Sequence, residues 1–159
     1  MNVLVLGSGA REHALCWSLA SSTLISKLYC APGNPGIENE AECINLNIDN
    51  NQEIIDFSKK HNINLVIPGP ETQLVNGIVD DLKKNNIKAF GPSKAAAKLE
   101  GSKKFTKDGC TKANVPTAKF NHFKEKAKAL HFLDKVTFPI VVKADGLAAG
   151  KGVTIAKNK

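Results

Sequence analysis

The chain has 159 residues and a formal net charge of +7, with 42% apolar and 23% charged residues. This composition is typical of a globular protein and excludes a disordered tail, and because only 6% of the residues are aromatic the core is expected to be mostly aliphatic. No apolar run approaches the length that a bilayer requires, and the N-terminus lacks a basic, cleavable leader, so we expect a cytoplasmic protein.

The first hundred residues alternate between short apolar strands and helices of about ten residues. The predicted strands comprise residues 3–6, 27–30, 65–67 and 88–90, and most of them end at glycine or proline turns. The predicted helices comprise residues 11–20, 51–61, 74–85 and 94–99. Strands separated by helices indicate an α/β fold with a doubly wound, mostly parallel sheet, in which ligands bind at the carboxyl ends of the strands.

The second part of the chain is more basic than the first. Residues 1–100 carry a net charge of −2, whereas residues 101–159 carry +9, and we place a domain boundary near residue 100. The predicted elements after it are a helix at 102–113 that is broken or strained at Gly109, a strand at 117–120, a helix at 124–133, and strands at 139–143 and 153–156. A sheet formed from so few elements cannot bury the apolar side chains of its strands. We therefore expect this part to need further residues of the same protein, or a partner protein, to complete its core.

The first motif is GSGAREHA at residues 7–14, directly after the first predicted strand. Glycines at such a turn allow backbone N–H groups to approach a phosphate, and Arg11 could bind it in a bidentate manner. A dinucleotide fingerprint would need glycine where Glu12 stands and an acidic residue after the second strand, so the motif argues against an NAD-type site. A phosphate or phosphosugar site and a plain glycine turn both remain open.

The second motif, Pro68-Gly69-Pro70-Glu71, falls at the same edge of the predicted sheet. Glu71 could accept hydrogen bonds from sugar hydroxyls or an amine. By itself, the motif favours a simpler role for Glu71 at the N-terminus of the helix that follows.

The third motif is the glycine-rich segment 145–152, which follows Lys143. It lacks the glycine spacing and the Ser/Thr of a Walker A loop, and a strand rather than a helix follows it. A hairpin loop over nucleotide phosphates fits better, with Lys143 and Lys151 as cations, and a flexible surface hairpin is the alternative.

The cysteines, the histidines and the lysines of residues 103–128 indicate no further catalytic, metal or nucleic-acid site. The four cysteines (Cys16, Cys30, Cys43 and Cys110) form no C-x-x-C pair, which favours buried or inert thiols over disulfides or a zinc site. The histidines have neither ligand spacing nor a nucleophile partner. The lysines of residues 103–128 lack an aromatic platform, so a solvated helix face is favoured over a nucleic-acid surface.

Together these motifs resemble the N-terminal part of the phosphoribosylamine–glycine ligase family, within the ATP-grasp superfamily. The matching stretches run through the chain in order: VLVLGSGAREHAL (3–15), YCAPGNPG (29–36), GPETQLVNGIVD (69–80), FGPSKAAAKLEGSKKFTKD (90–108) and PIVVKADGLAAGKGV (139–153). The resemblance implies a Rossmann-like pre-ATP-grasp domain at residues 1–100, which helps to bind phosphoribosylamine. It implies an incomplete ATP-grasp domain at residues 101–159.

The resemblance also implies a reaction of de novo purine biosynthesis. ATP phosphorylates glycine, and the amine of phosphoribosylamine attacks the glycyl phosphate to give glycinamide ribonucleotide, ADP and phosphate. Substrate binding is implied for Gly7, Gly9, Arg11, Glu12, Asn34, Gly36 and Glu71. ATP binding is implied for Lys103, Lys143, Gly146, Gly150, Lys151 and Gly152. The expected partners are these small molecules, not nucleic acid or a membrane.

The resemblance places the ligands of the family's Mg²⁺ or Mn²⁺ outside this chain. In agreement, the four acidic residues after Gly101 do not cluster along the sequence as metal ligands would. We therefore expect a fragment that cannot catalyse the ligation alone. The alternative is a non-catalytic module that binds phosphate or nucleotide, or a basic nucleic-acid binder.

Overall fold

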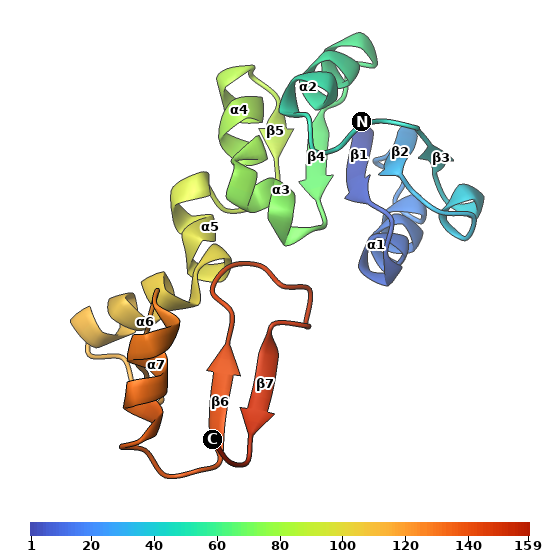
Figure 1. Ribbon diagram of the computed structural model, residues 1–159. Helices are drawn as coiled ribbons and strands as arrows, with labels where there is room; N and C mark the ends of the chain where they lie inside the picture. Colours follow the sequence, from blue (N-terminus) through green and yellow to red (C-terminus); the bar gives the residue numbers. More distant parts are fainter. The chain divides into compact units, whose positions relative to one another are not determined.

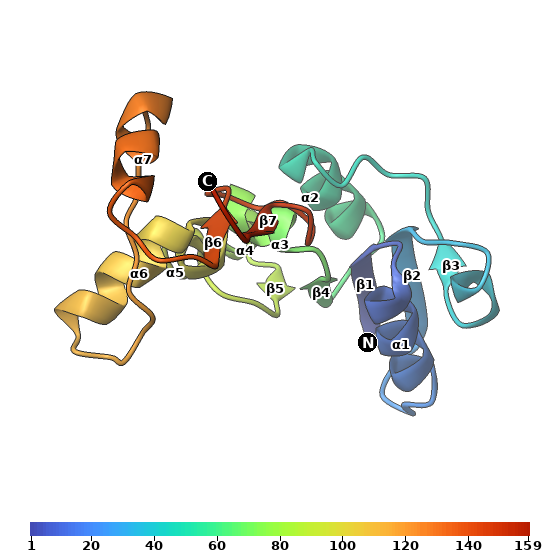
Figure 2. The ribbon, with the colours of Figure 1, turned by 60° about the horizontal axis from the view of Figure 1, so that its bottom comes forward.

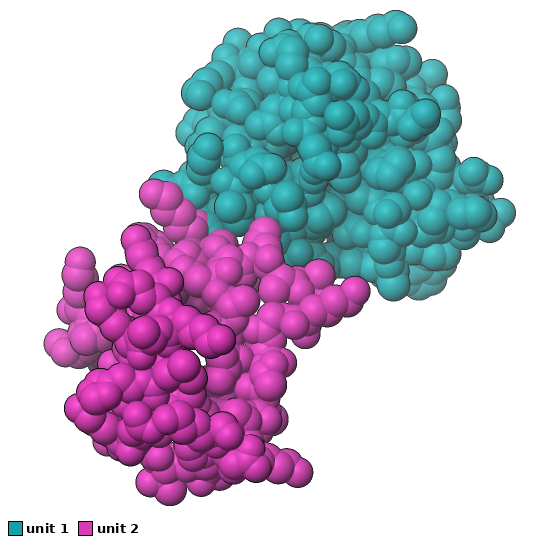
Figure 3. All heavy atoms as spheres, viewed as in Figure 1, with its two compact units in different colours: residues 1–97 teal, residues 98–159 magenta.

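The computed structural model describes residues 1–159, which form two compact units, Met1–Ala97 (unit 1) and Lys98–Lys159 (unit 2) (Figure 3). No helix in either unit combines the length and the apolar composition needed to cross a bilayer.

Unit 1 is built on a sheet of five parallel strands in the order β3-β2-β1-β4-β5 (Figure 1). The strands are β1 (Asn2–Gly7), β2 (Lys27–Pro32), β3 (Glu42–Cys43), β4 (Leu65–Pro68) and β5 (Lys88–Ala89). The predicted parallel, doubly wound α/β fold is therefore confirmed. The edge strand β3 was missed, because two residues without an apolar run give no recognisable pattern.

Helices cover both faces of the sheet, so the central strand β1 is buried on both sides (Figure 2). One face of β1, with Val3 and Val5, packs with helix α1 (Ala10–Ala20) and the 3₁₀ helix η1 (Ile37–Asn39). The other face, with Leu4 and Leu6, packs with helices α2 (Asn51–Lys60) and α4 (Ile78–Lys84). This burial on both faces explains why β1 is a continuous apolar run rather than an alternating pattern.

The helix predicted at residues 74–85 is wrong in its extent. The chain instead forms α3 (Glu71–Asn76) and α4, separated by Gly77 in the left-handed region at φ +95°. The Gly77 N–H donates to the carbonyls of Gln73 and Leu74 and closes α3 in the manner of a glycine C-cap. A Cβ at Gly77 would lie 2.9 Å from Cδ of Lys94, so the packing of a distant lysine also favours the break.

Unit 2 contains the end of α5 (Lys94–Gly101), the helices α6 (Lys103–Lys112) and α7 (Lys126–Leu133), and the strands β6 (Ile140–Lys143) and β7 (Val153–Ala156). The expected break at Gly109 is wrong, because α6 runs through it without interruption. The strand predicted at residues 117–120 is also wrong, because this segment has no regular structure. The Lys107 ammonium donates instead to Thr117 Oγ1 and to the Ala118 carbonyl.

The strands β6 and β7 form an antiparallel hairpin whose apolar side chains stay exposed. Val141 lies opposite Ile155 in the hairpin, and they remain 55% and 66% exposed. No residue of unit 2 is buried. A two-stranded sheet without a covering layer is marginally stable, so unit 1 supplies most of the core of this chain.

Candidate functional site

Three loops meet at the carboxyl edge of the unit 1 sheet, where the sequence predicts the substrate site. Gly7, at the end of β1, lies beside Pro32, at the end of β2, and Leu6 lies beside Pro68 of β4. Backbone hydrogen bonds continue past the strands, because Gly33 N–H donates to Gly7 O (3.1 Å) and Gly69 N–H donates to Leu6 O (2.9 Å). The order of the strands reverses between β1 and β4, which is where open α/β sheets bind ligands.

Arg11 connects the loop after β1 with the loop after β4. Its guanidinium donates to the Gly69 carbonyl (2.7 Å) and to Glu71 Oε1 (2.9 Å). Both side chains of the ion pair are about half exposed, at 59% and 44%, so a ligand can reach them. Glu71 is the first residue of α3 and also a partner of Arg11, a contact that the sequence did not reveal.

The ion pair gives Glu71 a pH-dependent role in stability. Its own backbone N–H and then the Arg11 guanidinium hold the pKa of Glu71 below its usual value, against the opposing effect of burial. The resulting stabilisation is complete above the ordinary glutamate pKa of about 4.3. It disappears as the pH falls through the lower pKa of the folded state.

We expect Glu71→Gln to lower the free energy of unfolding by about 0.5 kcal/mol at pH 7, because an exposed pair contributes little. At a pH well below both pKa values, the variant and the wild-type chain should be equally stable. Urea unfolding at the two pH values tests this expectation, and an equal difference at both would contradict it.

Glu12 lies beneath the loops that follow β1 and β4, and it is only 5% exposed. It is the third residue of α1, and its Oε2 accepts a hydrogen bond of 2.6 Å from the N–H of the N-cap residue Gly9. Its carboxyl group also lies against Gly7 and Gly69, where added Cβ atoms would overlap it. Glu12 therefore fills the space that a third fingerprint glycine would leave open.

Asn34 joins the loop after β2 to the loop after β1. Its side-chain amide donates to the Ser8 carbonyl (2.8 Å), and its Oδ1 accepts from the N–H groups of Gly36 (2.8 Å) and Ile37 (3.1 Å). Gly36 is needed because a Cβ there would lie 2.8 Å from Cε1 of His13. His13 was assigned no role from the sequence, and its packing against a distant glycine could not be foreseen.

The seven predicted substrate residues are thus together at one edge of unit 1. They lie at the end of β1 (Gly7), in the loops (Gly9, Asn34 and Gly36), in the first turn of α1 (Arg11 and Glu12) and at the start of α3 (Glu71). Gly69 is a further member of this cluster that the sequence did not reveal. Its carbonyl accepts a hydrogen bond from Arg11, and its lack of a Cβ leaves room for Glu12, and neither contact can be read from a local pattern.

In unit 2, the N-terminus of α6 is linked to the predicted glycine loop. Lys103 Nζ donates to the Gly146 carbonyl (2.7 Å), and Ser102, the N-cap of α6, donates to Asp145. Gly146 and Gly150 adopt φ values of +89° and +77°, which side chains rarely tolerate. The loop closes the hairpin, since Ala144 N–H donates to Gly152 O (2.8 Å).

Asp145 was not assigned to the site from the sequence, although it organises this loop. Burial opposes its ionisation, but the N–H groups of Lys104 and Gly146 and the Ser102 hydroxyl together hold the pKa of Asp145 below its usual value. Lys143, at the end of β6, and Lys151, in the loop, are exposed and have no hydrogen bond or ion pair through their side chains. In this structure Lys103 therefore contacts the glycine loop, whereas the side chains of Lys143 and Lys151 contact no polar group of the chain.

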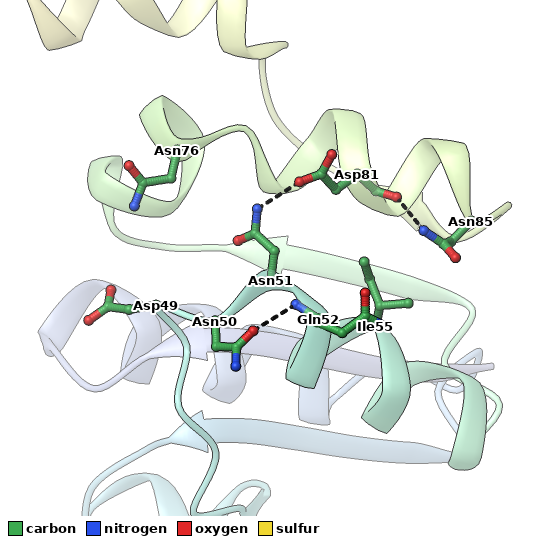
Figure 4. Close-up of a pocket in the computed structure, with 8 residues that line it drawn as sticks. All are labelled: Asp49, Asn50, Asn51, Gln52, Ile55, Asn76, Asp81 and Asn85. Carbon is green, nitrogen blue, oxygen red and sulfur yellow. Dashed lines mark hydrogen bonds between the residues drawn. The ribbon is translucent and has the colours of Figure 1, made fainter.

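A polar groove between α2 and α4 contains none of the predicted site residues (Figure 4). Its side chains largely satisfy one another: Asn51 donates to Asp81 Oδ2 (2.9 Å), and Asn85 donates to the Asp81 carbonyl (3.0 Å). The Asn51–Asp81 bond joins α2 to α4, and the Asn85 bond caps the C-terminus of α4, so both contacts indicate a structural role.

Two family models match the chain end to end. The model described as phosphoribosylglycinamide synthetase, N domain, matches residues 1–100, and that of the ATP-grasp (A) domain of the same synthetase matches residues 101–159. Enzymes of the ATP-grasp family use ATP and act on small-molecule substrates.

Individual relatives agree with the family models. The phosphoribosylamine–glycine ligase of Mesorhizobium japonicum is 58% identical over 156 residues, which are 98% of this chain and 37% of the relative. The ligase of Clostridium acetobutylicum is 49% identical and covers 99% of this chain and 38% of its own length. The crystal structure of phosphoribosylamine–glycine ligase from Thermotoga maritima superposes with a TM-score of 0.77 at 28% identity, over 99% of this chain and 36% of that one.

The chain thus spans little more than a third of the length of these relatives. The expected resemblance is nevertheless confirmed along its whole sequence, in both domain models and in the fold. The chain belongs to the phosphoribosylglycinamide synthetase family, whose curated relatives are named phosphoribosylamine–glycine ligase.

Proposed function

We propose that this chain serves an enzyme that ligates glycine to 5-phosphoribosylamine, with ATP converted to ADP and phosphate through glycyl phosphate. The observation that carries the proposal is the meeting of three unit 1 loops at one sheet edge, in a chain that matches this family from end to end. Arg11 joins the loops after β1 and β4, and Asn34 joins the loops after β1 and β2. Phosphoribosylamine carries a phosphate, ring hydroxyls and an amine, and the loops offer a guanidinium and carboxylates to these groups.

In this proposal, the loops of unit 1 hold and orient phosphoribosylamine. The N–H groups of Ala10 and Arg11 have no acceptor within the chain, and they lie at the positive end of the α1 dipole. With the Arg11 guanidinium, they can neutralise a phosphate. Glu71 and Glu12 are acceptors suited to hydroxyl or amine donors. The loops thus position the substrate amine and supply no nucleophile of their own.

The segment that joins β6 and β7 is proposed to bind the phosphates of ATP. The backbone N–H groups of Gly146–Gly152 and the lysines Lys103, Lys143 and Lys151 are donors and cations of the kind that a phosphoryl transfer requires. The division into 1–100 for phosphoribosylamine and 101–159 for ATP is part of the same proposal.

A divalent metal is part of the proposed reaction but is assigned to no residue here. No three His, Cys, Asp or Glu side chains of this chain are arranged to hold a metal ion. Asp145 hydrogen-bonds to its own loop and to α6, and Asp108 pairs with Lys104. We therefore propose that Mg²⁺ or Mn²⁺ is held by residues beyond those of this chain.

The test is glycine- and phosphoribosylamine-dependent ADP release by the protein made from its own gene. We expect Arg11→Ala to raise KM for phosphoribosylamine about tenfold, since it removes a bidentate, charge-assisted contact. Lys88→Ala, at the start of edge strand β5, removes one positive charge away from the loops and should leave KM unchanged. Release of ADP that does not depend on glycine would overturn the proposed reaction.

A second measurement addresses the length of the chain. The purified 159-residue chain is expected to release no ADP in a glycine-dependent manner. An intact mass of the gene product well above 17.1 kDa would agree with this expectation. A gene product of 17.1 kDa without activity would instead favour a binding module.

A further inference from the structure

The buried carboxylate of Glu12 occupies a position that an anionic ligand takes in many sheets of this kind. In dinucleotide-binding folds, the second glycine of the turn after the first strand lets the backbone approach a pyrophosphate. Here that glycine is Gly9, and its N–H already donates to Glu12 Oε2 at 2.6 Å. The turn thus carries its own internal anion.

The surrounding glycines show that this placement is built into the fold. A Cβ at Gly7 would lie 2.6 Å from Glu12 Cγ, and a Cβ at Gly69 would overlap Glu12 Oε1. Gly7 is the last residue of β1, and Gly69 directly follows β4. The Glu12 side chain is therefore enclosed between two loops that both lack a side chain at the point of contact.

One oxygen of this carboxylate is still free to bind. Glu12 Oε1 accepts no hydrogen bond within the chain. It is also absent from the side-chain atoms that are fully buried without a partner, which are Ser58 Oγ and Gln73 Oε1. Glu12 Oε1 therefore keeps some access to solvent beside Gly69, where it can accept a hydrogen bond from a hydroxyl or an amine but would repel a phosphate.

We propose that Glu12 is a specificity-determining residue that excludes pyrophosphate-bearing ligands from the turn after β1 and selects a ligand with a hydroxyl or amine donor beside Gly69. This inference rests on the proposed function for the identity of the phosphosugar substrate. The exclusion of pyrophosphate rests on the Gly9 contact alone. A phosphate of the substrate then lies toward Arg11, and its sugar lies toward Glu12.

The experiment compares two probes, ribose 5-phosphate and inorganic pyrophosphate, by NMR titration of the ¹⁵N-labelled 159-residue chain. Glu12→Gln keeps the size of the side chain and an acceptor for Gly9 but removes the charge. We expect this variant to bind ribose 5-phosphate about tenfold more weakly, because a hydrogen bond to a charged group is lost. Pyrophosphate should bind about tenfold more tightly, because a repelling charge is gone.

The matched control is Glu53→Gln. Glu53 occupies the same third position of its helix, α2, but is exposed and accepts its hydrogen bonds from Asn50 and Asn47. It should leave both affinities unchanged. If a folded Glu12→Gln variant shows the wild-type preference between the two probes, the inference is overturned. If the wild-type chain does not bind ribose 5-phosphate but the Glu12→Gln variant binds pyrophosphate more tightly, the exclusion of pyrophosphate by Glu12 is supported and the proposed phosphosugar substrate is contradicted.

The wild-type chain provides a measurement that does not depend on a variant folding. Hydrogen exchange at the Gly9 N–H should be slow, because a buried carboxylate accepts it, and saturating pyrophosphate should leave it slow. Exchange at the rate of an unstructured glycine, or a loss of protection on adding pyrophosphate, contradicts the proposal.

Discussion

Replacing Gly7 by alanine is expected to lower the free energy of unfolding of unit 1 by about 3–5 kcal/mol. Gly7 has φ +126°, which costs any residue with a side chain, and a Cβ there would lie 2.6 Å from Cγ and 2.7 Å from Cδ of Glu12. Because Glu12 is buried, it can move only by giving up its hydrogen bond to Gly9. Urea unfolding followed by the fluorescence of Trp17, the single tryptophan, measures the loss.

Gly109→Ala is the control for this prediction. Gly109 lies within α6 with nothing within 4 Å of an added Cβ, so alanine should favour the helix and leave the Trp17 transition unchanged. Combining Gly7→Ala with Glu12→Ala removes the clash and leaves the backbone strain. The loss of unfolding free energy in the double variant should therefore be smaller, by about 1–2 kcal/mol, than the sum of the losses in the two single variants. Strict additivity would show that the two residues do not act on each other.

Replacing Lys103 by alanine is expected to lower kcat/KM for ATP about 100-fold in the protein made from its own gene, if the proposed ligation is correct. Lys103 is the first residue of α6, and its ammonium already contacts the glycine loop through the Gly146 carbonyl. The substitution removes both a positive charge beside the proposed phosphate site and a contact that holds the loop. Glycine-dependent ADP release at varied ATP concentration is the measurement.

Lys112→Ala serves as the matched control for Lys103→Ala. It removes the same charge from the last residue of the same helix, at an exposed position, and should change the rate less than twofold. A Lys103→Ala protein as active as the Lys112→Ala protein would remove Lys103 from the proposed ATP site.

The errors of the sequence-based prediction fall where distant contacts decide the local structure. The predicted helix at 74–85 is broken at Gly77, where the side chain of Lys94 packs, and this contact joins residues far apart in the sequence. The error at Gly109 has a local cause instead: α6 begins at the Ser102 N-cap and continues through Gly109, and the Thr111 hydroxyl donates to the Lys107 carbonyl across it. Local propensity costs at a single glycine are about 1 kcal/mol, and such contacts offset them.

The sequence alone was enough to predict the class of fold, the positions of the main strands along the chain and the family, because continuous apolar runs, regular spacing and glycine-rich turns are local features of a sequence. It also identified the loop residues at the sheet edge, since parallel strands bring their carboxyl ends together. The tertiary structure was needed to show how these residues contact one another: Arg11 pairs with Glu71, Asn34 joins two loops, and Glu12 fills the space between Gly7 and Gly69. The hydrogen bonds of Asn34 and Arg11 join residues that are 26 and 60 positions apart in the sequence, and pairings of that kind are set by packing rather than by any local pattern.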